Sequence, residues 1–193
     1  MSAKSKSKPK PAPNKTTTAA RAQAAPQLTH TFESGFWRNN WLPVLLLDAG
    51  VELDSLYTAD ITRTLPVGGR FTPAQRKVYD AVLAAQEAGM AAARPGAKFS
   101  DVHAAAIRVI AEHLHDWGLL PVSVEQSLDP EQGGHHRRWM VHGTSHHLGI
   151  DVHDCAQARQ QNYRDGELRP GMVITVEPGL YFKSTDLLVP EEL

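Results

Sequence analysis

Fifteen residues in the last third of the sequence carry many of the side chains that could do chemistry. The segment MVHGTSHHLGIDVHD, residues 140–154, holds four histidines and two aspartates. Imidazole nitrogens and carboxylate oxygens bind divalent metals, and imidazoles transfer protons near neutral pH. The segment therefore predicts either a metal or proton-transfer site or a polar surface turn, and the rest of the sequence has to distinguish the two.

Three further carboxylates lie beside apolar residues in segments whose pattern is typical of strands: Asp48, Asp60 and Glu177. A carboxylate in such a position is costly to bury unless it is paired or bound to a metal. Asp48 and Asp60 are twelve residues apart across an expected hairpin, so their side chains can share one face. Two carboxylates that close repel each other, and a divalent cation between them would remove the conflict.

Each of these carboxylates also has an ordinary structural interpretation. Asp48 precedes Ala-Gly and Glu177 precedes Pro-Gly, so both could be turn residues. Asp60 could instead form an ion pair with Arg63. Taken together, carboxylates with one or two imidazoles favour Mn²⁺, Co²⁺ or Zn²⁺ over a structural zinc held by thiolates. A pair of such ions roughly 3.5–4 Å apart would activate a bridging water and polarise a carbonyl.

The elements that position these side chains are predicted from hydrophobic periodicity and from turn residues. Residues 43–72 indicate two antiparallel strands, with the first ended by Gly50 and a turn at about 50–54. Helices are expected over residues 72–96 and 100–120, and a strand over residues 172–176. This order predicts an α+β fold in which helices pack against a mainly antiparallel sheet.

Composition bounds the partners and the compartment. The 193 residues have a formal net charge of −1, with 41% hydrophobic and 21% charged residues, which predicts neither a nucleic-acid nor a membrane partner. No apolar run approaches the roughly 18 residues needed to cross a bilayer. The single cysteine, Cys155, cannot form an internal disulfide, which favours a reducing compartment and a cytoplasmic location.

Three segments are expected along the chain. Residues 1–28 are basic, rich in Pro and Ala, and contain no acidic residue, which predicts a disordered tail. Such a tail either binds a polyanion or is only solvated, and blocks of like charge usually do the latter. Residues 29–43 stay unassigned, and residues 44–193 are expected to form the folded domain.

Four spaced motifs together resemble the metallopeptidases of the pita-bread fold, and among them the Xaa-Pro aminopeptidases. The motifs are LLLDAGVE, YTADITRTLPV, HGTSHHLGIDVHD and LRPGMVITVEPGLYF, in the family's order across residues 44–188. The resemblance implies a partial pita-bread fold over residues 44–193. It also implies release of the N-terminal residue from peptides with proline at the second position, by attack of a metal-activated water.

Two alternatives to this function stay open. Prolidases, which cleave Xaa-Pro dipeptides, belong to the same fold and are the nearest rival. A catalytically inactive pita-bread module, acting as a binding domain or surviving as a decayed fragment, is an alternative of a different class.

The resemblance implies metal binding by four side chains: Asp48, Asp60, His146 and Glu177. It implies that His142 and His153 contact substrate and move protons, and that Glu177 also acts in catalysis by handling a proton of the attacking water. His147 stands where the family tolerates other residues and receives no role. The expected cofactor is two Mn²⁺ ions, with Co²⁺ or Zn²⁺ as alternatives.

The sequence departs from the family's pattern in two places. Asp48 and Asp60 are separated by eleven residues, one more than usual, which implies a longer turn. The glutamate that completes the family's ligand set, on a later strand within Arg-Ile-Glu-Asp, has no counterpart up to Leu193. We therefore expect weak or single-metal binding and little peptidase activity. We also expect exposed strand edges that favour association, including homo-oligomers.

Overall fold

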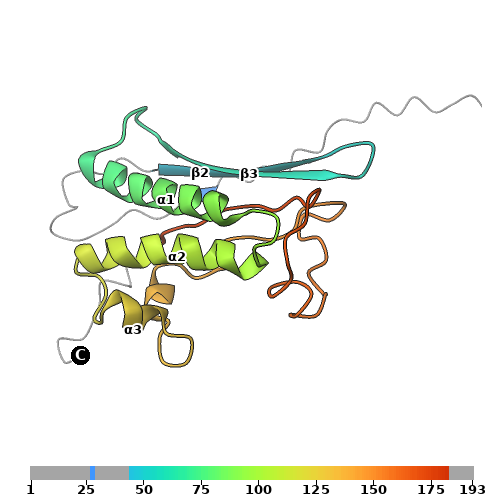
Figure 1. Cartoon of the computed structure of the whole chain (residues 1–193). Helices are drawn as coiled ribbons and strands as arrows, with labels where there is room; N and C mark the ends of the chain where they lie inside the picture. Colours follow the sequence, from blue (N-terminus) through green and yellow to red (C-terminus); the bar gives the residue numbers. More distant parts are fainter. Residues whose placement is uncertain (1–26, 29–43, 183–193) are drawn as a thin grey trace, which may run out of the picture.

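The computed structural model describes residues 27–28 and 44–182, which form an α+β arrangement (Figure 1). The strands are β1 (Gln27–Leu28), β2 (Val44–Glu52) and β3 (Thr58–Pro66), and the helices are α1 (Pro73–Ala92), α2 (Phe99–Asp116), α3 (Val124–Leu128) and the short 3-10 helix η1 (His135–Arg138). The α+β class and the two long helices expected from the sequence are confirmed. Each helix in the described part of the chain is too short or too polar to span a bilayer.

The sheet is antiparallel in the order β1-β2-β3. Gly50 pairs with Asp60, and Asp48 pairs with Thr62. Because side chains alternate along a strand and cross-strand partners share a face, Asp48 and Asp60 lie on one face of the hairpin. The register therefore brings the two predicted ligands to the same side.

The expected end of the first strand at Gly50 is wrong, since β2 continues to Glu52 and the turn follows it. A Cβ at position 50 would lie 2.6 Å from the carbonyl oxygen of Ala59 on β3. Glycine here allows the two strands to approach, and does not interrupt them.

At the other edge, β1 consists of the last two residues of the predicted basic tail, paired with Leu45 and Leu46 of β2. The rest of that tail and residues 29–43 lie outside the described residues.

The core lies around α2 and not on the hairpin. α1 begins with a capping box in which the Thr72 hydroxyl accepts from the Gln75 N–H and the Gln75 side chain accepts from the Thr72 N–H. The larger hydrophobic cluster joins both long helices to Trp139 and Met140, and a smaller one is built on Phe99. Among the described residues, the strands contribute nothing to either cluster.

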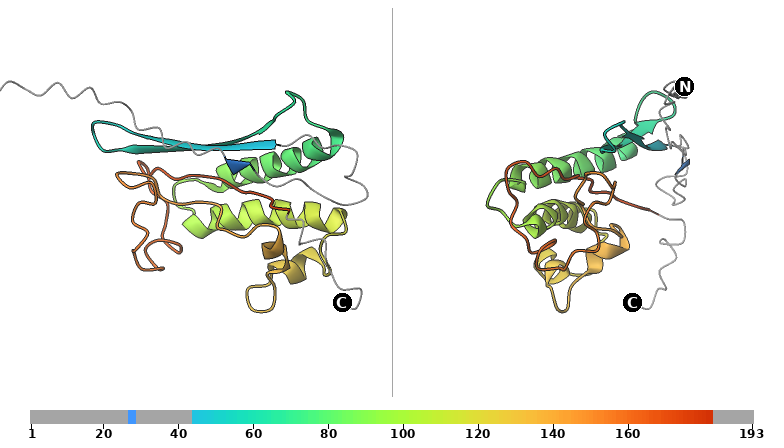
Figure 2. Two further views of the ribbon diagram at one scale, coloured as in Figure 1. Left: turned by 180° about the vertical axis from the view of Figure 1, so that it is seen from behind. Right: turned by 90° about the vertical axis from the view of Figure 1, so that its right-hand side faces the viewer.

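The expected strand over residues 172–176 is wrong in part. Only Ile174 forms an isolated bridge, to His147, and the flanking residues are irregular. The backbone of this segment does hydrogen-bond to a neighbour: Leu148 N–H donates to Val173, Thr175 N–H to His146 and Glu177 N–H to Thr144. Its partner is the irregular histidine segment, residues 140–154, and not a strand, so no regular ladder of hydrogen bonds forms. In both views of Figure 2 this red segment runs between the hairpin and α2.

We predict that Gly89→Ala destabilises the protein because α1 packs tightly on this segment. A Cβ at position 89 would lie 2.8 Å from Cγ1 of Val176, well inside van der Waals contact. Overpacking of this kind costs about 1–3 kcal/mol, and alanine gains roughly 1 kcal/mol of helix propensity over glycine. We therefore expect a net loss of up to about 2 kcal/mol in the free energy of unfolding, measured by urea denaturation.

Val176→Ala, alone and combined with G89A, is the matched control for this prediction. The double variant should recover part of the loss, because the clashing methyl group is gone. A more stable G89A protein would contradict the packing described here.

Candidate functional site

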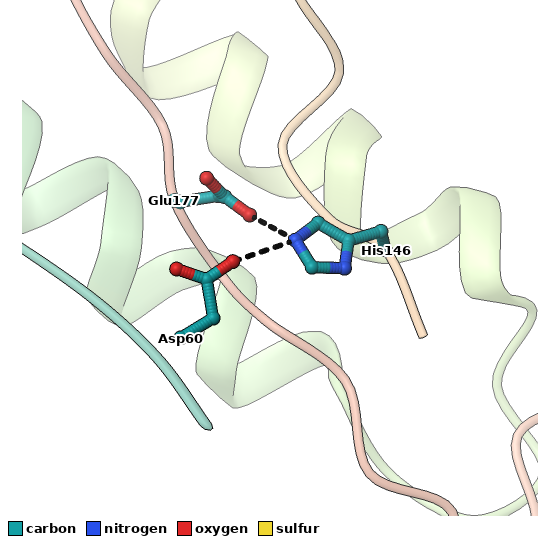
Figure 3. A group of neighbouring side chains, drawn as sticks. All are labelled: Asp60, His146 and Glu177. Carbon is teal, nitrogen blue, oxygen red and sulfur yellow. Dashed lines mark hydrogen bonds and ion pairs between the residues drawn. The ribbon is translucent and has the colours of Figure 1, made fainter. Parts of the chain in front are cut away.

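Three side chains from separate parts of the chain converge beside the hairpin (Figure 3). His146 Nε2 lies 3.1 Å from Asp60 Oδ2 and 2.9 Å from Glu177 Oε1. The side chains of His146 and Asp60 are 14% and 16% exposed, and that of Glu177 is 35% exposed. One ligand atom from each lies within 4.8 Å of the others. Three of the four side chains predicted as metal ligands therefore lie together.

The hydrogen bonds of His146 orient its Nε2 atom as a metal ligand would be oriented, toward the carboxylates of Asp60 and Glu177. Its Nδ1 lies 3.0 Å from the carbonyl oxygen of His147, which only accepts, so Nδ1 donates. In the neutral imidazole, Nε2 then presents a lone pair toward two carboxylate oxygens. A divalent cation between the three atoms would bind that lone pair and balance both negative charges. An imidazole oriented by an N–H···O=C bond on its far side is common among metal-ligating histidines.

Asp48, the fourth predicted ligand, is exposed and lies outside this group of three. It nevertheless affects the same region. Burial, followed by the negative charges of Glu177 and Asp48, raises the pKa of Tyr181 above its ordinary value.

His142, predicted to contact substrate, is exposed and bonded to Tyr181. Its Nδ1 lies 2.7 Å from the Gly143 carbonyl oxygen, so Nδ1 donates there. Its Nε2 then accepts from the Tyr181 hydroxyl at 2.6 Å. Tyr181 was not predicted as a site residue, although it lies within the motif that contains Glu177.

His153, the other histidine predicted to act on substrate, lies beside His146 with 4.5 Å between ring centroids, and the rings are nearly perpendicular. His147 lies elsewhere, between the rings of Phe99 and Tyr163, at 4.9 Å from each. Burial lowers the pKa of His147, which favours a neutral, packed imidazole. The adjacent histidines 146 and 147 thus point to different surroundings.

Threonines join the segments that carry the site, although none of them was predicted from the sequence as a site residue. The Thr58 N–H and hydroxyl both donate to the Gly149 carbonyl at 2.9 Å, which ties the histidine segment to β3 two residues before Asp60. Thr144 is fully buried, and its carbonyl accepts from the Glu177 N–H at 2.7 Å. Sequence alone offers no signal for these roles, because a threonine pattern is not specific to any chemistry.

Known proteins resemble this chain over most of its length. Residues 19–189 match metallopeptidase family M24. Xaa-Pro aminopeptidase 1 of Streptomyces coelicolor is 58% identical over 161 residues, which cover 81% of this chain and 32% of that protein. The Xaa-Pro aminopeptidase of Escherichia coli is 42% identical over 149 residues, or 77% of this chain and 32% of that one.

A solved structure resembles the fold as well. Zn-substituted E. coli aminopeptidase P in complex with product matches with a TM-score of 0.67 at 42% identity, covering 77% of this chain and 32% of that chain. The chain thus spans about a third of the length of the curated relatives it matches.

We predict that stability falls below pH 6.5 because of His103, whose Nδ1 lies 2.8 Å from the Thr144 hydroxyl. Burial, and then the positive charges of His136 and Arg137, lowers the pKa of His103 from its ordinary 6.5. Between the lowered pKa and 6.5 the unfolded chain binds a proton that the folded chain does not. The free energy of unfolding therefore decreases as pH falls through this window, by up to about 1.4 kcal/mol per pH unit.

His103→Asn cannot titrate, so its urea-denaturation curves between about pH 7.5 and 5.5 should show a smaller slope with pH than the wild-type curves. His135→Asn, at an exposed histidine, is the control and should keep the wild-type slope. Equal slopes for H103N and wild type would contradict the assignment.

Proposed function

Since this chain belongs to metallopeptidase family M24, we propose that it carries the metal-binding region of an enzyme that releases the N-terminal residue from peptides whose second residue is proline. Family membership and the structural likeness confirm the partial pita-bread α+β fold. The observation that carries the functional proposal is the convergence of His146 Nε2 with the carboxylates of Asp60 and Glu177. Two partly buried carboxylates that approach the same imidazole nitrogen repel each other, and a cation between the three groups would relieve this repulsion.

The proposed ligands are the three converging side chains and Asp48, which shares the hairpin face of Asp60. The set is mostly oxygen, so the proposed cofactor is Mn²⁺, at two positions, with Co²⁺ or Zn²⁺ as alternatives. When bound, such ions polarise a carbonyl and lower the pKa of a coordinated water.

The side chains around these ligands have separate proposed roles. Glu177 is partly exposed and has a second carboxylate oxygen that can take the proton of an attacking water. His142 is exposed and held by Tyr181, so it is accessible to contact the peptide. His153 packs edge-on against His146 and is exposed, which suits it to pass a proton between the site and solvent.

The proposed partner is a peptide, and neither nucleic acid nor membrane is proposed, because the net charge is −1. We also propose a homo-oligomer, because one face of the hairpin exposes the apolar side chains of Val51, Ile61 and Leu65. Sedimentation equilibrium that gives only the monomer mass would reject it. An exposed free Cys155 favours the cytoplasm, which fractionation of the source cells would test.

The metal site is tested by titrating the purified 193-residue chain with MnCl₂ in a calorimeter. We expect Mn²⁺ binding by the wild type and at least about a tenfold loss of affinity in Asp60→Ala, because a ligand is removed. Glu87→Ala, at an exposed glutamate on α1, should bind like the wild type. Absence of binding, or equal binding by D60A, would reject the site.

The reaction is tested with the same proteins and two substrates, an Xaa-Pro-Xaa tripeptide and an Xaa-Pro dipeptide. Any hydrolysis of the tripeptide should depend on Mn²⁺ and disappear in D60A. Hydrolysis of the dipeptide alone would favour a prolidase. Binding of Mn²⁺ and peptide without turnover of either substrate would favour the inactive binding module.

A further inference from the structure

The Thr175 hydroxyl joins two of the proposed ligands to each other. Thr175 Oγ1 accepts from the backbone N–H of His146 at 3.0 Å. It also lies 2.7 Å from Glu177 Oε1, which can only accept when ionised, so the hydroxyl donates to this oxygen. The same Oε1 atom is the one that lies 2.9 Å from His146 Nε2.

The single hydroxyl proton of Thr175 has one good acceptor. The other oxygen within reach, the His146 carbonyl, is 3.5 Å away and already accepts from the Thr175 N–H at 2.9 Å. A hydrogen bond of 2.7 Å to a carboxylate is short and charge-assisted, and so is much stronger than one at 3.5 Å. The hydroxyl proton therefore points to Glu177.

The alternation of residues 174–177 explains why this threonine faces the site. Ile174 and Val176 pack against the cluster built on Phe99, and Val176 also lies against Gly89 of α1. In an extended segment the intervening side chains point the opposite way, so Thr175 and Glu177 share the side toward His146.

We propose that Thr175 is a positioning residue for metal binding, whose hydroxyl orients the Glu177 carboxylate toward His146 Nε2 and fixes the His146 backbone. This inference rests on the proposed metal site. Without the hydroxyl, the backbone bonds from Thr175 N–H to His146 and from Glu177 N–H to Thr144 would still hold the segment. Loss of the hydroxyl therefore acts on ligand orientation more than on the fold.

The test compares Mn²⁺ binding by the 193-residue chain in wild type, Thr175→Val and Thr175→Ser, by calorimetry with MnCl₂ alone and by the rise in melting temperature that Mn²⁺ produces. Valine has the shape of threonine without the donor, whereas serine keeps it. We expect T175V to bind Mn²⁺ about 10–100-fold more weakly, as removal of groups that orient metal ligands does, and T175S to bind close to wild type. The metal-free melting curve of each variant establishes that it is folded at the assay temperature.

If T175V is unfolded at that temperature, T175S against Thr175→Ala makes the same comparison, since both lack the methyl group and differ only in the hydroxyl. Equal affinity of T175V and wild type would overturn the inference and leave the metal site standing. A T175S affinity as low as that of T175V would overturn it too, because the hydroxyl would then not be the cause. Absence of Mn²⁺ binding by the wild type would reject the proposed function, and this inference with it.

Discussion

The site depends on backbone hydrogen bonds between two irregular segments, residues 144–148 and 173–177. Three N–H groups, on Leu148, Thr175 and Glu177, donate across this contact. They set His146 and Glu177 side by side without a regular sheet. Since neither segment belongs to a helix or a strand, these bonds, together with the bond from the His146 N–H to the Thr175 hydroxyl, hold their backbones in place relative to each other. Asp60 is brought in by a different contact, the two bonds from Thr58 to Gly149. The three-residue group therefore needs both contacts at once.

The helices act on the site through one side of the segment 174–177. Val176 fills the space left by the missing side chain of Gly89, and the Gln86 side chain donates to the Val176 carbonyl at 3.2 Å. Glu177 is the next residue, so its backbone position follows from the packing on α1. Protein interiors transmit such small shifts because they are densely packed. A helix that contributes no ligand still determines where a ligand lies.

Residue type and period were enough to predict the α+β class, the antiparallel hairpin and both long helices. The same reasoning singled out Asp60 and Glu177, and the resemblance to the pita-bread metallopeptidases added His146. These three side chains lie together, while their metal-binding role stays a prediction. Prediction from the sequence failed for segments whose structure depends on the segment with which they pair. An apolar run such as residues 172–176 does not reveal that its neighbour is an irregular loop. A glycine such as Gly50 is equally consistent with the end of a strand and with a point where two paired strands approach closely. The Thr144 hydroxyl bonds to His103, 41 residues away, and the Thr175 hydroxyl joins nearby Glu177 to His146, 29 residues away, so sequence patterns around these threonines do not reveal their partners.

The position of Asp48 bears on how many cations the hairpin can hold. Along β2 it is two residues from Gly50, the partner of Asp60, which displaces it by roughly 7 Å on the same face. It therefore stays outside the compact group of Asp60, His146 and Glu177, although its charge still acts on Tyr181. Three ligand atoms within 4.8 Å of one another suit one cation. In the proposed site, Asp60, His146 and Glu177 would hold a first cation, and Asp48 would be the side chain on which any second one depends.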